Sequence, residues 1–158
     1  IGRIGLFQPK GSRIRADSRL AHVAAALRDG RLREFAIANP EHAPYGRAAE
    51  AALGRAGLRD LLSRRLVLGE NVAQAAQFVQ SGAADAAIIA KSLAVAPALR
   101  ASGRFRDVPE DMHPPLVQGG LILPWAGSRA AAEQLRDFLL GNEGRELLTA
   151  FGFGLPSR

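Results

Sequence analysis

Short, wholly apolar runs alternate along the chain with segments of helical periodicity, and few fold classes accommodate that pattern. Phe35–Ala38 and Ala86–Ala90 are too short for helices, and their lack of polar residues is typical of strands buried on both faces. The segments 20–30 and 71–80 repeat apolar residues every three or four positions, as the buried face of a helix does. This alternation predicts an α/β fold with a mainly parallel sheet.

Capping residues and helix breakers place the remaining elements. Asp17 and Asn71 each precede a periodic segment, and Gln74 follows Asn71 by three residues in a capping-box pattern. Ser128 and Asn142 are expected to cap two helices near the C-terminus. Further helices are expected over 45–56 and 58–63, and further strands over 3–7, 66–68, 105–108 and 116–123.

The composition excludes several classes of protein. At 158 residues and 47% hydrophobic content, the chain is long enough for one ordinary domain with its own core. The absence of cysteine excludes a disulfide framework and thiolate chemistry. No apolar run reaches the roughly 18 residues of a transmembrane helix, and no signal peptide is visible. The net charge of +6 comes from scattered residues, which favours a solvated basic surface over a nucleic-acid site.

Signatures of enzymatic chemistry are scarce. The chain contains no H-E-x-x-H zinc motif, no G-x-S-x-G nucleophile elbow and no Walker phosphate loop. His22, His42 and His113 lie far apart in sequence and lack the spacing of metal ligands. Glu41-His42 is interpreted as an exposed loop pair rather than an acid/base pair. The sequence therefore predicts a protein that is not an enzyme and holds no cofactor.

Two segments share a design that suits an anion. In each, an apolar strand is followed by a polar loop that opens a helix: 39–46 ahead of the helix at 45–56, and 69–72 ahead of the helix at 71–80. The first N–H groups of a helix have no partner within the helix, and the helix dipole favours negative charge there. In an open α/β sheet such loops lie at the carboxyl ends of the strands, where ligands bind. The pair predicts an oxyanion site without charged side chains.

The amino-acid sequences of these two loops resemble those of a known family. The string A-N-P-E-H-A-P-Y-G at 38–46, followed by Gly69-Glu70-Asn71-Val72, is similar to the periplasmic molybdate-binding proteins, the substrate-capturing subunits of molybdate ABC importers. Lys91-Ser92, Val117-Gln118-Gly119-Gly120 and Phe151-Gly152-Phe153 continue the likeness in order. The likeness covers the chain from Ile4 onward.

The resemblance implies an α/β, type II periplasmic-binding fold of two lobes with the anion in the cleft between them. In this reading 1–8 is a crossing strand from lobe one, 9–115 is lobe two, and 116–158 is the return strand and C-terminal helices of lobe one. The chain begins where the family's first crossing strand begins, so we expect it to hold one complete lobe and the C-terminal part of the other. Apolar residues on the last two helices are then expected to be bare, and the isolated chain to self-associate.

The resemblance also implies the site and its ligand. Carried over by position, Tyr45 and Val72 contact the oxyanion and Asn71 is the supporting N-cap. Some members carry a tyrosine near the position of Ala90, so the Tyr45 atom that meets the anion is left open. The ligand is molybdate, with tungstate as a second substrate, and no cofactor is needed. The implied partner is a membrane permease, the implied location the periplasm, and the implied native state a monomer.

Three alternatives remain at this point. The same site type serves other oxyanions such as sulfate or phosphate. A similar two-lobed fold serves as the effector domain of transcription regulators, in which case a helix-turn-helix precedes it. The third alternative is an enzyme of the same fold, a transferase that acts on phosphorylated substrates. The lack of a recognisable set of acid and base residues counts against this alternative.

Overall fold

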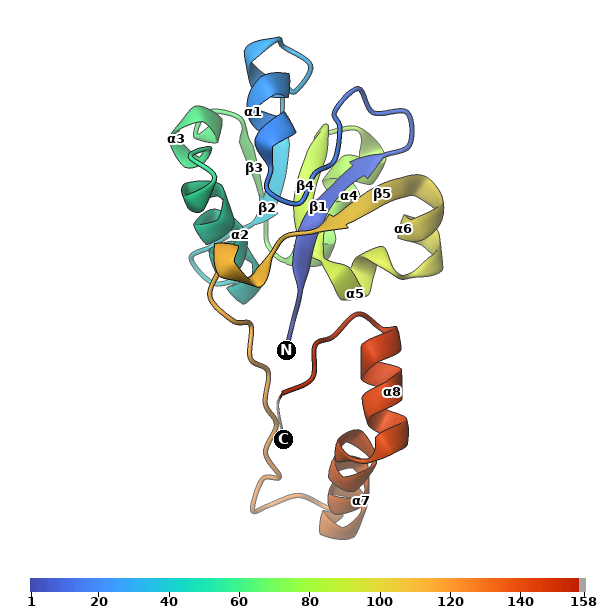
Figure 1. Cartoon of the computed structure of the whole chain (residues 1–158). Coiled ribbons are helices and arrows are strands. Elements are labelled where there is room, and N and C mark those ends of the chain that lie inside the picture. The colour runs from blue at the N-terminus through green and yellow to red at the C-terminus, as the bar shows by residue number, and fades with distance from the viewer. Residues whose placement is uncertain (157–158) are drawn as a thin grey trace.

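The computed structural model describes residues 1–156 and shows a sheet-containing body with two helices set apart from it (Figure 1). The strands are β1 (Ile4–Pro9), β2 (Phe35–Ala38), β3 (Leu66–Gly69), β4 (Ala86–Ala90) and β5 (Gly103–Asp107). The helices are α1 (Ala21–Arg28), α2 (Pro44–Arg55), α3 (Arg59–Leu62), α4 (Val72–Ser81), α5 (Lys91–Ala94), α6 (Pro97–Ser102), α7 (Arg129–Leu140) and α8 (Asn142–Ala150), with a 3-10 turn at Glu110–Met112. No helix within 1–156 is both long and apolar enough to cross a membrane.

The five strands form one sheet in the order β3-β2-β4-β1-β5. β2 pairs parallel with β3 and β4, whereas β1 pairs antiparallel with β4 and β5. Four strands therefore share one direction, and β1 alone runs against both of its neighbours. The α/β class predicted from the sequence is confirmed, but the sheet is mixed, because an apolar run does not reveal the direction of its strand.

Two apolar cores lie on opposite faces of this sheet. One contains Leu6, Ile37 and Ile88 and is covered by α1 and α2. The other contains Phe7 and Ile89 and is covered by α4. Adjacent strand residues fall into different cores because successive side chains point to opposite faces. Burial on both faces explains why these strands show no polar alternation.

Asp17 is not the N-cap residue of the first helix that the sequence predicted, because Leu20 holds that position. The side chain of Asp17 still accepts hydrogen bonds from the backbone N–H groups of Ala21 and His22, each at 2.9 Å. Regular helix starts four residues after Asp17, because Leu20 adopts a left-handed conformation with φ of 63°. These bonds hold the pKa of Asp17 below its ordinary value, although burial of the carboxyl acts in the opposite direction.

The C-terminal part departs from two predictions. The strand expected over 116–123 does not form within the described residues, where Leu116 makes one antiparallel bridge with Gly2 and the rest has no neighbouring strand. A strand needs a partner for its backbone groups, which periodicity alone cannot supply. Asn142 does not cap α8 either: Gly141 holds the cap position and Asn142 is the first helical residue. Ser128 caps α7 as expected, accepting from Ala131 N at 3.4 Å.

Helices α7 and α8 pack on each other rather than on the sheet (Figure 1). Gly144 is buried at their contact, where an added Cβ would overlap the backbone of Phe138. Within residues 1–156, no buried apolar side chain of either core lies beyond Leu116. Of the apolar residues expected to be bare, Leu148 is partly buried, whereas Leu135, Phe138, Leu139, Leu147 and Phe151 are exposed as predicted. Other large apolar side chains of this region are also exposed: Val117, Leu121, Leu123, Trp125 and Leu140. The division into lobes at 8 and 115 stays a prediction.

Candidate functional site

The two loops singled out in the sequence lie side by side because their strands are neighbours. Ala38 and Gly69 are register partners at the carboxyl ends of the parallel strands β2 and β3. Just beyond them, the N–H of Asn39 donates to the carbonyl oxygen of Gly69 at 2.7 Å. The Nε2 atom of His42 lies 3.2 Å from the carbonyl oxygen of Glu70, a second link between the loops. The N-termini of α2 and α4 therefore open at the same edge of the sheet.

The cap of α4 leaves one amide of its first turn free. The side-chain oxygen of Asn71 accepts from the N–H groups of Ala73 and Gln74, both at 3.0 Å. The side chain of Gln74 reaches back to the N–H of Glu70 at 2.7 Å, one residue before the N-cap position that a capping box uses. Among residues 1–156, nothing accepts from the N–H of Val72, whose side chain packs against the second core. Asn71 thus acts as the predicted cap and exposes the Val72 amide.

A similar arrangement opens α2. Its first residue is Pro44, which has no N–H, and Arg47 already donates to the carbonyl oxygen of Ala43 at 3.1 Å. The N–H groups of Tyr45 and Gly46 have no acceptor within the described chain. Gly46 is buried, and an added Cβ would overlap the backbone of Ala38. The first turn of α2 is therefore seated directly on the end of β2.

The phenol of Tyr45 points to the segment that leads toward α7. Its hydroxyl oxygen accepts a hydrogen bond from Gln118 Nε2 at 2.9 Å. Gly2 lies against the same hydroxyl, leaving no room for a Cβ. Burial raises the pKa of Tyr45, and the hydrogen bond from Gln118 opposes that shift. The side chain is thus engaged within the protein, and the amide is the Tyr45 group that remains free.

The site is neutral in its interior and carries only exposed charges at its rim. Glu70 is exposed, and one of its carboxylate oxygens lies 3.5 Å from Nε2 of His42. Arg47 donates weakly to the carbonyl oxygen of Pro40 at 3.4 Å. No group of three or more metal-ligating side chains occurs within residues 1–156. The available donors are backbone amides at two helix N-termini, which suit a hard, multiply charged oxyanion.

Comparison with known proteins gives the family. The sequence profile of the family described as bacterial extracellular solute-binding protein matches residues 1–154. The chain belongs to this family of solute-binding proteins. It is 36% identical to the molybdate-binding protein ModA of Azotobacter vinelandii over 83% of this chain and 52% of that protein. It is 32% identical to ModA of Rhodobacter capsulatus over 77% of this chain and 47% of that protein. This solute-binding protein spans about half the length of these curated relatives.

Solved structures agree with the sequence comparison. The periplasmic molybdate-binding protein of Azotobacter vinelandii superposes with a TM-score of 0.82 and 30% identity, covering 99% of this chain and 66% of that one. A substrate-binding domain from Clostridium difficile superposes with a TM-score of 0.75 at 22% identity, which shows the fold alone. The resemblance and the periplasmic-binding fold predicted from the sequence are confirmed.

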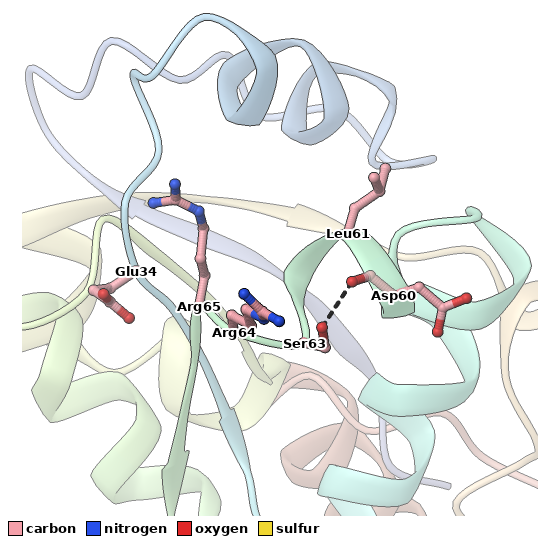
Figure 2. A pocket seen from close by; sticks show the side chains of 6 residues that line it. All are labelled: Glu34, Asp60, Leu61, Ser63, Arg64 and Arg65. Atoms are coloured by element: carbon pink, nitrogen blue, oxygen red, sulfur yellow. Dashed lines mark hydrogen bonds between the residues drawn. The ribbon is translucent and has the colours of Figure 1, made fainter.

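The solute-binding protein has a separate cavity of about 350 Å³ at the opposite end of β2 and β3 (Figure 2). Glu34 and Arg65 of its lining immediately precede those strands, so the cavity lies at their amino ends. Carboxylates and guanidinium groups both surround it, and Ser63 donates to the carbonyl oxygen of Asp60 at 2.8 Å. It contains none of the residues predicted to bind the anion.

Sequence reasoning missed two residues of the candidate site, Gly2 and Gln118. Gln118 lies within a stretch that carried the resemblance, but its pairing with Tyr45 spans 73 residues and has no local signal. Gly2 precedes the predicted elements altogether. The three predicted residues do lie at adjacent helix starts, as the sheet order requires.

Proposed function

We propose that this protein captures molybdate, and also tungstate, in the periplasm and delivers it to the permease of an ABC importer. The observation that carries the proposal is the pair of uncapped amides, on Tyr45 and Val72, at helix N-termini that follow neighbouring parallel strands. The molybdate-binding names of the relatives support the choice of ligand. The chain spans about half of those relatives, and the amides of Tyr45 and Val72 are the donors that we assign to it.

Neutral donors suit this task physically. A tetrahedral dianion is stabilised by several N–H groups and by the positive ends of helix dipoles, and no counter-charge has to be released on delivery. Because α2 and α4 fix the positions of the donors, the size of the anion determines how many N–H groups reach it at a favourable hydrogen-bond distance. The cargo needs no cofactor and no covalent chemistry, in keeping with membership of a solute-binding family. We take the native protein to be a monomer that binds no nucleic acid.

Substitution of Val72 by proline tests the site. Proline removes the free N–H but suits the first position of a helix, and the extended backbone of Asn71 is compatible with a following proline. We expect molybdate binding to weaken by about 1.5–3 kcal/mol, as for a hydrogen bond to a charged group. Isothermal titration calorimetry with sodium molybdate measures this.

Asn142→Pro is the matched control, since Asn142 is the first residue of α8 and is preceded by Gly141 in an extended conformation. It should leave molybdate affinity unchanged. An affinity for molybdate that is the same in the Val72→Pro and wild-type proteins would exclude the Val72 amide as a donor. Sulfate competition in the same titration tests the ligand: displacement of molybdate by equimolar sulfate would contradict molybdate as the selected anion.

A further inference from the structure

A second cavity, of about 560 Å³, lies between the loop that follows β1 and the edge strand β5. Four arginines line it: Arg13, Arg15, Arg104 and Arg106. It contains none of the residues of the candidate molybdate site. Gly2, which contacts Tyr45, precedes the start of β1, whereas the cavity lies at the other end of this strand. The cavity is therefore separate from the candidate molybdate site.

Strand register puts the charged residues on one face. In the antiparallel pair of β1 and β5, Gln8 is opposite Arg104 and Leu6 is opposite Arg106, and residues directly opposite point to the same side. Leu6 belongs to the first apolar core, so both arginines extend from the edge of that core's face. None of the four cavity arginines forms an ion pair with any residue of 1–156. The four arginines are exposed and line one cavity without an ion-pair partner in the described residues.

The side chain of Gln8 lines the same cavity but is almost entirely buried. The side chain of Gln8 is 3% exposed, and its Oε1 atom has no hydrogen-bond partner within the described residues. Buried acceptors without a donor are rare, and each costs stability that a bound donor would restore. The cavity therefore offers arginines without ion-pair partners, and beside them an unpartnered acceptor that a ligand donor reaches once the Gln8 side chain turns toward the cavity.

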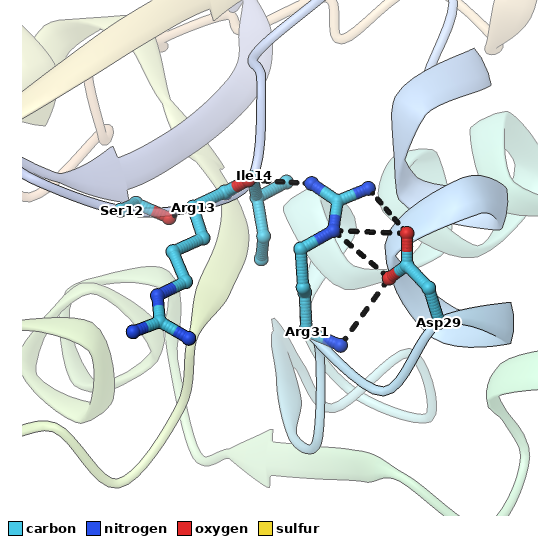
Figure 3. A network of polar contacts seen from close by, with 5 residues as sticks. All are labelled: Ser12, Arg13, Ile14, Asp29 and Arg31. Atoms are coloured by element: carbon cyan, nitrogen blue, oxygen red, sulfur yellow. Dashed lines mark hydrogen bonds and ion pairs between the residues drawn. The ribbon is translucent and has the colours of Figure 1, made fainter.

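Hydrogen bonds within the chain hold the loop that forms one wall of the cavity (Figure 3). Arg31 pairs with the carboxylate of Asp29 at 2.6 Å and donates through Nη1 to the carbonyl oxygen of Arg13 at 2.5 Å. The N–H of Ile14 donates to Ser12 Oγ at 3.1 Å, which tightens the same loop. The guanidinium of Arg13 is directed away from the Arg31–Asp29 ion pair and takes no part in it (Figure 3).

We propose that this cavity binds a small organic anion that carries a phosphate group together with a hydroxyl donor, as a polyol phosphate does. The arginines hold the anionic group, since their planar forks match phosphate oxygens. The hydroxyl donates to Oε1 of Gln8 after that side chain turns toward the cavity. The cavity volume falls in the range of small-molecule sites and exceeds what a bare tetrahedral oxyanion fills. Phosphoglycerol head groups of lipids carry the same chemistry.

Calorimetry with glycerol 1-phosphate, in the presence of saturating molybdate, tests the proposal. The double variant Arg104→Gln/Arg106→Gln should lose about tenfold or more in affinity, because charge-assisted bonds to phosphate are removed. Arg28→Gln/Arg55→Gln is the control: both side chains are exposed and outside the cavity, and the net charge changes equally. The proposal is wrong if the wild-type protein binds neither free glycerol 1-phosphate nor vesicles of phosphatidylglycerol. It is also wrong if the two double variants bind glycerol 1-phosphate equally well, because the arginines then serve only as charges on an edge strand.

A separate substitution tests whether Gln8 accepts a hydrogen bond from the ligand. Gln8→Leu should reduce the preference for glycerol 1-phosphate over sulfate, an anion without a hydroxyl donor, while thermal unfolding shows that the variant folds. An unchanged preference would exclude the contact with Oε1. Co-sedimentation with vesicles of phosphatidylglycerol separates the two sources of the ligand: binding to free glycerol phosphate indicates a soluble ligand, and binding to vesicles alone indicates a lipid head group.

Discussion

The backbone amide and the phenol of Tyr45 lie in different surroundings. Its backbone N–H is free at the start of α2, whereas its hydroxyl is held by Gln118 and lies against Gly2. The side chain thus joins the candidate site to the segment that leads toward α7 and α8. The resemblance placed Tyr45 in the site but left the contacting atom open. The hydrogen bonding of the phenol now favours the amide.

The ionisation of Tyr45 is directly measurable, because it is the one tyrosine of the chain. Burial raises its pKa above the ordinary value, so between the unfolded and folded pKa values the native state holds one more proton. The free energy of unfolding should therefore be unaffected below the unfolded pKa and fall as pH rises through that window. Tyr45→Phe should abolish that tyrosine-dependent part of the slope. Gln118→Leu should raise the pKa further, since the hydrogen bond lowers it.

Ultraviolet absorbance of the phenolate, followed against pH with and without urea, checks this. The native transition should lie at higher pH than the transition in urea. Coincident transitions would contradict burial of the phenol.

At the scale of elements, the position of the site depends on how closely α2 approaches β2. Gly46 permits this approach because a side chain there would overlap Ala38. Gly54, in the same helix, has open space around its missing Cβ. The two glycines therefore have different roles. Gly46 allows the first turn of α2 to lie against the sheet, whereas Gly54 only lowers the stability of the helix.

Alanine substitutions separate these roles. Gly46→Ala should destabilise the protein by about 1–3 kcal/mol, because α2 must move away from the strand end. Gly54→Ala should stabilise it by about 0.5–1 kcal/mol through helix propensity alone. Urea unfolding measures both, and molybdate titration should show weaker binding only for Gly46→Ala. Equal effects of the two substitutions would show that the approach of α2 is not tight.

On the scale of the whole molecule, the C-terminal helices leave an extensive apolar surface uncovered. Leu135 and Leu147 are 59% and 48% exposed, and Trp125 is 76% exposed. Monomers rarely expose contiguous apolar patches beyond about 300–600 Å². At about 25 cal/mol per Å², covering about 400 Å² contributes about 10 kcal/mol, comparable with the net stability of a domain.

We therefore expect the isolated 158-residue chain to self-associate through 116–158 or to leave that segment poorly protected. Light scattering measures the first outcome and hydrogen exchange over the last forty or so residues the second. Leu135→Glu should reduce association, whereas Leu61→Glu, an equally exposed leucine on the body that contains the sheet, should not. A stable monomer with strongly protected α7 and α8 would contradict this account.

Local patterns in the sequence determined the local structure. The apolar runs became β2 and β4, Asn71 capped α4, and Gly82 ended it in the left-handed conformation that glycine tolerates. The candidate anion site was also predicted from these patterns, because a helix N-terminus and its cap involve residues only a few positions apart. These features depend on short-range bonds that one stretch of sequence contains in full.

Tertiary structure decided whatever required a distant partner. The reversed direction of β1 depends on its pairing with β4 and β5, and the pairing of Tyr45 with Gln118 joins segments 73 residues apart. The run 116–123 has the composition of a strand, yet within 1–156 only Leu116 pairs with a distant backbone segment, in a single bridge to Gly2. The arginine cavity arises from strand register, which sets Gln8 opposite Arg104. Hydrogen bonds between strands are made by backbone atoms common to all residues, so sequence patterns do not specify which strands meet.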